Sequence, residues 1–453
     1  MLGRSARSLS TTVCEKGLHD DSSTKHRSYI VSNGHNNDSL LISAAIVSLA
    51  GILFCSGSAA GLCYSSLKLP ILVTISVVWV AVLGLRARFT YLPVESIVAF
   101  VLIAGSVLVG SFANGELGHY SFAITILAII DSILIAISFG PKRTLKAYVW
   151  VMVILSAMSL IAFVFIVSGS IPPLPSMEAE NGKTVYLNGI IFCIDTALNY
   201  GRSIGVFWEP SIMAGYINVA LFLILVMRVP CRKWGRVILY LALLATESSG
   251  GLIGFMFVVT AAVALRGGKS GTLFTLMAVV ASLLFIAFYD QIEQALLNFN
   301  YEFFYKFFGG SESGTTQTRI DSPLVNLRIW NLSPFVGFGL DGASSLYSIM
   351  RIDSSVTNMA QTSTMTMFLA SFGILGISYT LAWVRALIRH KRLPLVSRVM
   401  GVALFALFLN EVPCTQFVMP YVLLFSFLGL DDTLLPFRSN VSHEKKAGID
   451  SGA

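Results

Sequence analysis

An arginine and a carboxylate lie close together where a polar stretch of this sequence enters an apolar one. The stretch 201–211 reads GRSIGVFWEPS and contains Arg202 and Glu209. Pro210 suits the first turn of a helix, where its missing N–H costs nothing. Glu209 would then lie at the helix N-terminus, where it could accept a proton from a substrate hydroxyl. The alternative is structural, in which Glu209 only favours the helix dipole and Arg202 only extends toward a membrane surface.

Small and polar residues continue along one face of the helix that we expect after Pro210. Ser211, Gly215 and Asn218 follow at i, i+4 and i+7, a spacing that places them on one side of an α-helix. We therefore predict that this stripe lines a cavity beside Arg202 and Glu209.

A second group of charged residues falls in the stretch 290–362. Arg319 and Arg328 are nine residues apart, with Asp321 between them and Arg351 further along. The guanidinium group is planar, stays charged and matches the oxygen atoms of a phosphate. These residues predict a site for a diphosphate. The alternative is a set of surface arginines paired with Asp321.

The composition indicates which elements must position these residues. Of 453 residues, 55% are hydrophobic and only 12% are charged, and the mean hydropathy is +0.76. The charged share is about half that of an average soluble domain, and apolar runs near the length of a membrane span recur. We predict an all-α polytopic membrane bundle. This excludes a soluble enzyme and a disordered chain, and the alternating segments of a β-barrel are not seen.

The cations lie in short clusters between the apolar runs, so the net charge of +7 indicates topology rather than a nucleic-acid partner. Placing these clusters in the cytoplasm predicts about twelve spans, cytoplasmic tails at 1–39 and 432–453, and a membrane domain over 40–431. Residues 169–205 and 290–362 would be external, and 237–265 would form a hairpin of two short helices. The other spans are expected near 40–60, 67–85, 93–112, 121–139, 147–168, 206–227, 271–289, 363–384, 394–412 and 416–431.

The six cysteines form no CxxC pair and no metal-ligand spacing with histidine, so no metal and no cofactor is expected. Cys193 and Cys414 fall where an oxidising compartment is possible, but the sequence does not pair them.

Three segments carry a resemblance to a known superfamily. Arg319 comes fifteen residues before a Pro-x-x-Gly-x-Gly turn, which consists of Pro334, Gly337 and Gly339. The stretch 202–211 opens with an Arg-x-x-Gly-x-aromatic pattern, and 373–376 reads GILG. Over about 200–380 the chain resembles the O-antigen ligase and polymerase superfamily of integral membrane glycosyltransferases. The resemblance implies a GT-C-like helical fold.

The resemblance implies a metal-independent polysaccharide polymerase, for O-antigen or exopolysaccharide, at the external face of the bacterial inner membrane. It would join repeat units carried on undecaprenyl diphosphate, with a chain-length regulator and a flippase as further partners. Glu209 and Arg319 would be catalytic. Substrate binding would fall to Arg202, Asp321, Arg328, Gly337, Gly339 and Arg351.

Two alternatives stay open. A ligase would transfer the glycan to lipid A core, but the family's ligases carry a His-Asn pair where this chain has Thr362 and Ser363. The arginine of the family's Thr-x-Ser-Arg hairpin motif is replaced by Ser249. A flippase of the same lipid-linked sugars would have short external loops, and the long segment 290–362 argues against it.

The topology can be tested with single cysteines in a cysteine-free background. We expect an impermeant thiol reagent to label position 311 in intact spheroplasts and position 233 only after permeabilisation. The reverse labelling pattern would contradict the predicted orientation and the external location of both charged groups.

Overall fold

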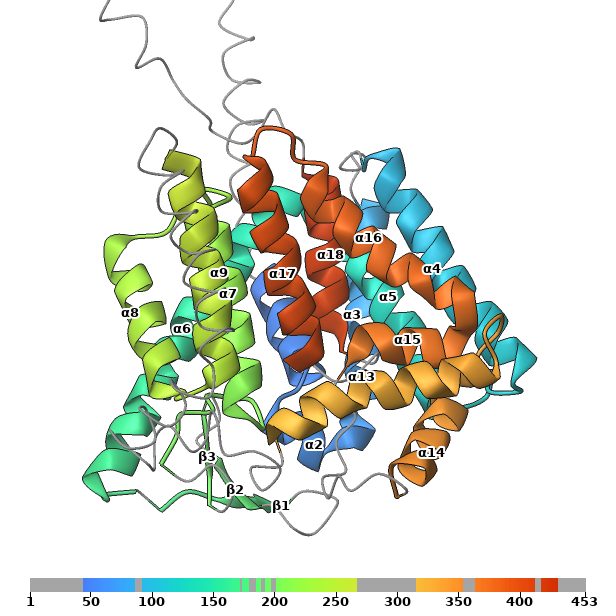
Figure 1. The fold of residues 1–453 in the computed structure, drawn as a ribbon. Coiled ribbons are helices and arrows are strands. Elements are labelled where there is room, and N and C mark those ends of the chain that lie inside the picture. Colours follow the sequence, from blue (N-terminus) through green and yellow to red (C-terminus); the bar gives the residue numbers. More distant parts are fainter. Residues whose placement is uncertain are drawn as a thin grey trace, which may run out of the picture. The chain divides into compact units, whose positions relative to one another are not determined.

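The chain forms a helical bundle with a small antiparallel sheet (Figure 1). The computed structural model describes residues 44–85, 92–171, 173–178, 185–188, 192–196, 201–266, 315–352, 363–411 and 417–430. After a first helix over Ala44–Phe54, the elements are α2 Ala59–Cys63, η1 Ser65–Leu67, α3 Lys68–Leu85, α4 Val94–Ala113, α5 Tyr120–Phe139, α6 Pro141–Ser168, β1 Ser176–Glu178, β2 Val185–Asn188, β3 Cys193–Asp195, α7 Pro210–Leu225, α8 Lys233–Ala245, α9 Ser249–Arg266, α13 Thr315–Leu332, α14 Gly339–Ile352, α15 Thr364–Phe372, η3 Gly373–Gly376, α16 Ile377–Ile388, α17 Leu395–Glu411 and α18 Val418–Gly429.

Within the described ranges, five helical stretches are long and apolar enough to cross a membrane: Ser65–Gly84, Val94–Ala113, Tyr120–Phe139, Pro141–Ser168 and Thr364–Ile388. Large apolar side chains on α3 and α4, such as Val77, Val101 and Leu102, are exposed. An exposed apolar surface of this kind fits contact with lipid. The expected span near 271–289 lies outside the described residues, so the total of about twelve spans stays a prediction.

The stretch 237–265 falls within two separate helices, as the sequence predicts. Helix α8 ends at Ala245 and α9 begins at Ser249. Glu247, in the connection, has a φ of 46°, a left-handed conformation that a regular helix does not contain. The chain therefore turns here, and α9 packs against α7 and α17.

The prediction of an all-α fold is wrong for residues 169–205. This segment contains a three-stranded antiparallel sheet in the order β1-β2-β3, in which Met177 pairs with Tyr186 and Asn188 pairs with Cys193. The short strands alternate their side chains between two faces. One face packs against α6 through Ile194, and the other packs against α2. Each strand has only three or four residues, and so short a run shows too little alternation for a strand to be predicted from the sequence.

The segment 290–362, which the sequence predicts as an external loop, contains regular helices in its described part. Its described part contains α13 and α14, and Figure 1 shows α13 running crosswise to α16, α17 and α18. Val325 and Ile329, four residues apart on α13, pack with Ala343, Tyr347 and Ala370. One face of α13 is therefore fastened to α14 and α15.

Helix α7 lies inside the bundle on all sides. Every residue from Pro210 to Ile224 is buried. A helix that is apolar on all sides is expected to be buried in this way. Its neighbours approach closely because they present small residues. A Cβ placed on Gly251 of α9 would lie 2.6 Å from the Ala214 Cβ of α7.

This close approach predicts a large difference between two glycine-to-alanine variants. Gly251→Ala must push α9 away from α7, and overpacking of this kind costs about 1–3 kcal/mol. Gly105→Ala in α4 meets no atom within 4 Å and should stabilise or leave stability unchanged. Unfolding of both variants in detergent, against wild type, measures the difference. Equal stability of the two variants would contradict the packing.

Candidate functional site

The segment that leads into α7 is held between the sheet and α2. Cys193 N–H donates to Gly205 O at 2.6 Å, and Ala59 N–H donates to Val206 O at 2.9 Å. Two consecutive residues thus bind two different elements. These hydrogen bonds fix the course of the chain up to Glu209.

Glu209 is the N-cap residue of α7, and Pro210 takes the first helical position, as predicted. The Glu209 side chain does not cap the helix and is exposed, and Ser211 Oγ donates to its Oε2 at 3.1 Å. A carboxylate here favours the positive end of the helix dipole. The same exposed carboxylate can accept a proton from a substrate hydroxyl, so both predicted roles fit this position.

Arg202 binds the connection that follows α8. Its Nε donates to Thr246 O at 3.1 Å and its Nη2 donates to Glu247 O at 2.8 Å. The last C=O groups of a helix lack partners within the helix, and a cation complements their negative charge. Arg202 therefore joins the segment before α7 to the α8–α9 connection. This structural role differs from extension toward a membrane surface, and binding of substrate by Arg202 stays a prediction.

The stripe of α7 lines a small cavity, but Arg202 and Glu209 are not among its lining residues, so the predicted cavity beside those two residues stays a prediction. Ser211, Gly215 and Asn218 face Gly250, Gly251 and Gly254 of α9 and Leu404, Leu407 and Phe408 of α17. The cavity has room for roughly one water molecule. Asn218 is buried, and its Nδ2 donates to Gly251 O at 2.7 Å. The cavity is therefore a small, mostly apolar space between three helices, too small for a sugar.

The structure does not place Arg319 and Arg328 on one side of their helix. Both belong to α13, and nine residues correspond to about two and a half turns. The two positions therefore lie on opposite sides of α13, with Arg328 exposed and Asp321 half-buried. Arg351 belongs to the last turn of α14. These backbone positions do not favour one diphosphate held jointly by Arg319 and Arg328.

The two glycine motifs of the resemblance contact each other. Ile374 N–H donates to Pro334 O at 2.7 Å, and Phe338 N–H donates to Ala370 O at 3.1 Å. Gly337 has a φ of 73°, and a Cβ on it would collide with the backbone of Ser371. Glycine is needed here for close backbone contact, whether or not this turn also binds substrate.

Gly339 makes room for a carboxylate that the sequence does not indicate. Glu116, in the connection between α4 and α5, is buried and lies at the N-terminus of α14. Its Oε2 accepts Leu340 N–H at 2.6 Å, and its Oε1 accepts Asp341 N–H at 3.0 Å and Gly342 N–H at 2.9 Å. A Cβ on Gly339 would collide with this carboxylate. Glu116 thus satisfies three N–H groups that α14 itself leaves without partners.

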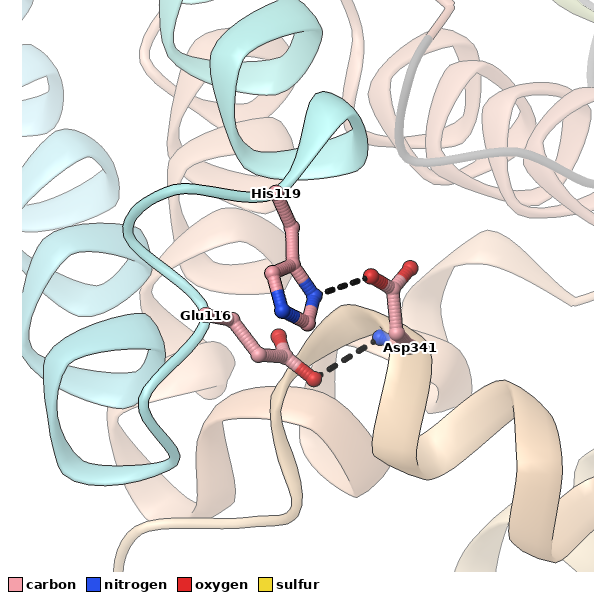
Figure 2. A group of neighbouring side chains, drawn as sticks. All are labelled: Glu116, His119 and Asp341. Atoms are coloured by element: carbon pink, nitrogen blue, oxygen red, sulfur yellow. Dashed lines mark hydrogen bonds and ion pairs between the residues drawn. The ribbon is translucent and has the colours of Figure 1, made fainter.

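His119 and Asp341 complete this cluster (Figure 2). His119 Nδ1 lies 2.7 Å from Asp341 Oδ2, and the two side chains are 51% and 49% exposed. Asp341 orients the ring, so Nε2 could exchange a proton with a ligand. Glu116, His119 and Asp341 offer ligand atoms within 4.8 Å of one another, enough for a metal. However, a cation here would face the positive end of α14 and a carboxylate already bound by three N–H groups.

Sequence reasoning did not find Glu116 and His119 because their partners lie more than two hundred residues away. The only local indication is a short polar connection, 114–119, between two apolar helices.

The chain matches no protein-family model and no curated protein sequence.

Removal of the Glu116 carboxylate should loosen α14. Glu116→Ala leaves the N–H groups of Leu340, Asp341 and Gly342 without their acceptor. The buried N–H of Leu340 alone would then cost about 1–3 kcal/mol. His119→Ala removes only a half-exposed pair, which contributes about 0–1 kcal/mol. Hydrogen exchange of the α14 amides should therefore rise strongly in Glu116→Ala and little in His119→Ala. Equal exchange in both variants would contradict the capping role.

Proposed function

We propose that this protein is a polysaccharide polymerase that joins lipid-diphosphate-linked repeat units at the external face of a bacterial inner membrane. The proposal rests on the resemblance of residues 200–380 to the O-antigen ligase and polymerase superfamily. We also propose that the chain has about twelve membrane spans and that both termini are cytoplasmic.

One structural observation supports it above the others. The described parts of the two segments expected outside the membrane lie at the same end of the bundle, where Figure 1 shows the sheet β1–β3, α2, α13 and α14. The segment before α7 joins the same sheet, so Glu209 begins α7 next to it. A lipid-linked glycan arriving at this end would meet Glu209 and the helix that carries Arg319.

In the proposed reaction, an acceptor hydroxyl of the incoming repeat unit attacks the anomeric carbon of the growing glycan. The bond between that carbon and the diphosphate oxygen breaks, and the lipid diphosphate leaves with the electron pair. Glu209 takes the hydroxyl proton. Negative charge develops on the diphosphate, where a preplaced guanidinium has its largest effect. Arg319 is assigned this role, and Arg328, Arg351 and Asp321 are assigned contacts with the glycan or its carrier.

Arg202 contributes to this site indirectly. Its hydrogen bonds to Thr246 O and Glu247 O hold the segment that ends at Glu209 against the α8–α9 connection. Substrate, a chain-length regulator and a flippase are the proposed partners. No cofactor is required, because the leaving group is already activated as a diphosphate.

The function is tested by deleting the gene and complementing it with Glu209→Gln. Glutamine keeps the size of the side chain but cannot take a proton, and general-base catalysis contributes about 10²–10⁴ in rate. We expect polymer nearly to vanish on a glycan gel, while single lipid-linked repeat units accumulate. If Glu209 only favours the helix dipole, the variant should make normal polymer.

Glu178→Gln is the matched control, since Glu178 is an exposed carboxylate on β1 of the same sheet region. It should make polymer at the wild-type level.

The glycans of the deletion strain itself distinguish the proposed polymerase from a ligase and from a flippase. Long glycan left on its lipid carrier would indicate a ligase, and repeat units retained at the cytoplasmic face would indicate a flippase.

A further inference from the structure

Two cysteines far apart in the sequence meet the same apolar cluster beside the segment that ends at Glu209. Cys193 opens β3 and is buried in a cluster with Ala59, Met177 and Tyr186, and Cys63 packs against this cluster. The structure holds both side chains as thiols. Their neighbours belong to different parts of the chain, so a covalent bond between them would join the sheet to α2.

The backbone brings the two cysteines to the same side. Ala59 and Cys63 are four residues apart in α2, so their side chains share one face of that helix. Ala59 is fully buried in the cluster that contains Cys193. The segment before α7 fixes both elements, because Cys193 N–H binds Gly205 O and Ala59 N–H binds the next residue, Val206. Alternation along β3 directs Ile194 toward α6 and Cys193 toward α2.

We infer that Cys63 and Cys193 form a disulfide bond in the mature protein and that this bond fastens the sheet to α2. The inference does not depend on the proposed enzymatic function. It requires only that this end of the bundle meets an oxidising compartment, where disulfides form and persist.

The bond forms by two thiol–disulfide exchanges with an external disulfide donor, R–S–S–R. The Cys63 thiolate attacks one donor sulfur and releases the first RSH after protonation. The Cys193 thiol then loses its proton and attacks the Cys63 sulfur of the mixed disulfide, which releases the second RSH. The two cysteines lose two electrons and two protons, and the donor is reduced to two thiols.

The order of these steps follows from the surroundings of the two sulfur atoms. Cys63 is half-buried, so it can be reached by the donor. Burial, and then the neighbouring Cys63, raise the pKa of Cys193 to about 12. At neutral pH Cys193 is therefore a thiol, and the thiolate is the attacking form. A reductant that attacks Cys63 must expel this high-pKa thiol, which leaves slowly. The closed bond should resist mild reductants.

The test uses the full-length protein in membranes prepared without reductant. All free thiols are blocked with N-ethylmaleimide in detergent, disulfides are then reduced, and the released thiols take a deuterated maleimide. We expect peptides containing Cys63 and Cys193 to carry the second label, and the peptide containing Cys231 to carry the first. A non-reduced digest should contain the Cys63 and Cys193 peptides as one cross-linked species.

Cys63→Ser identifies the pairing. In this variant Cys193 should take the first label, because its partner is gone. The inference is overturned if both cysteines of the wild-type protein take the first label, if Cys193 is cross-linked to Cys414, or if each cysteine carries a separate small-thiol adduct. The wild-type cross-linked peptide decides the question even if Cys63→Ser does not accumulate.

Discussion

The complete burial of α7 is the constraint on which the rest of the structure depends. Other helices can pack closely on every side of a buried helix only where they present small or complementary side chains. Glycines of α9 supply one such surface, and Phe408 of α17 packs against Tyr216 on another side. Tyr216 Oη donates to Ser56 O, and Tyr148 Oη donates to Tyr216 O, so buried hydrogen bonds tie α7 to its neighbours. These contacts fix the helix that has Glu209 as its N-cap residue.

The helices outside the central bundle are held by backbone contacts. The turn before α14 lies against the start of η3, and Glu116 reaches across from another connection to cap α14. Hydrogen bonds to a charged acceptor are stronger than neutral ones, and this carboxylate is buried. The position of α13 and α14, and with it that of Arg319, therefore depends on residues from three distant parts of the chain.

Arg202 and Glu209 show how one segment both fixes the course of the chain and presents an exposed carboxylate. Arg202 donates two hydrogen bonds to carbonyl groups that follow α8, and these bonds position the segment before α7. Glu209 follows seven residues later with an exposed carboxylate. A rigid support beneath an exposed carboxylate is the arrangement that the proposed role of Glu209 as a base requires. The inferred disulfide between Cys63 and Cys193 would strengthen the same support.

The sequence by itself determined the apolar helices, the break between α8 and α9, the start of α7 at Pro210 and the polar stripe of α7. These features depend on local periodicity and on single residues such as proline and glycine. Only the tertiary structure decided that Arg202 caps α8 and that Glu116 caps α14. It also revealed the small sheet. Each of these depends on contacts between residues far apart in the chain, and local sequence patterns carry no record of such contacts.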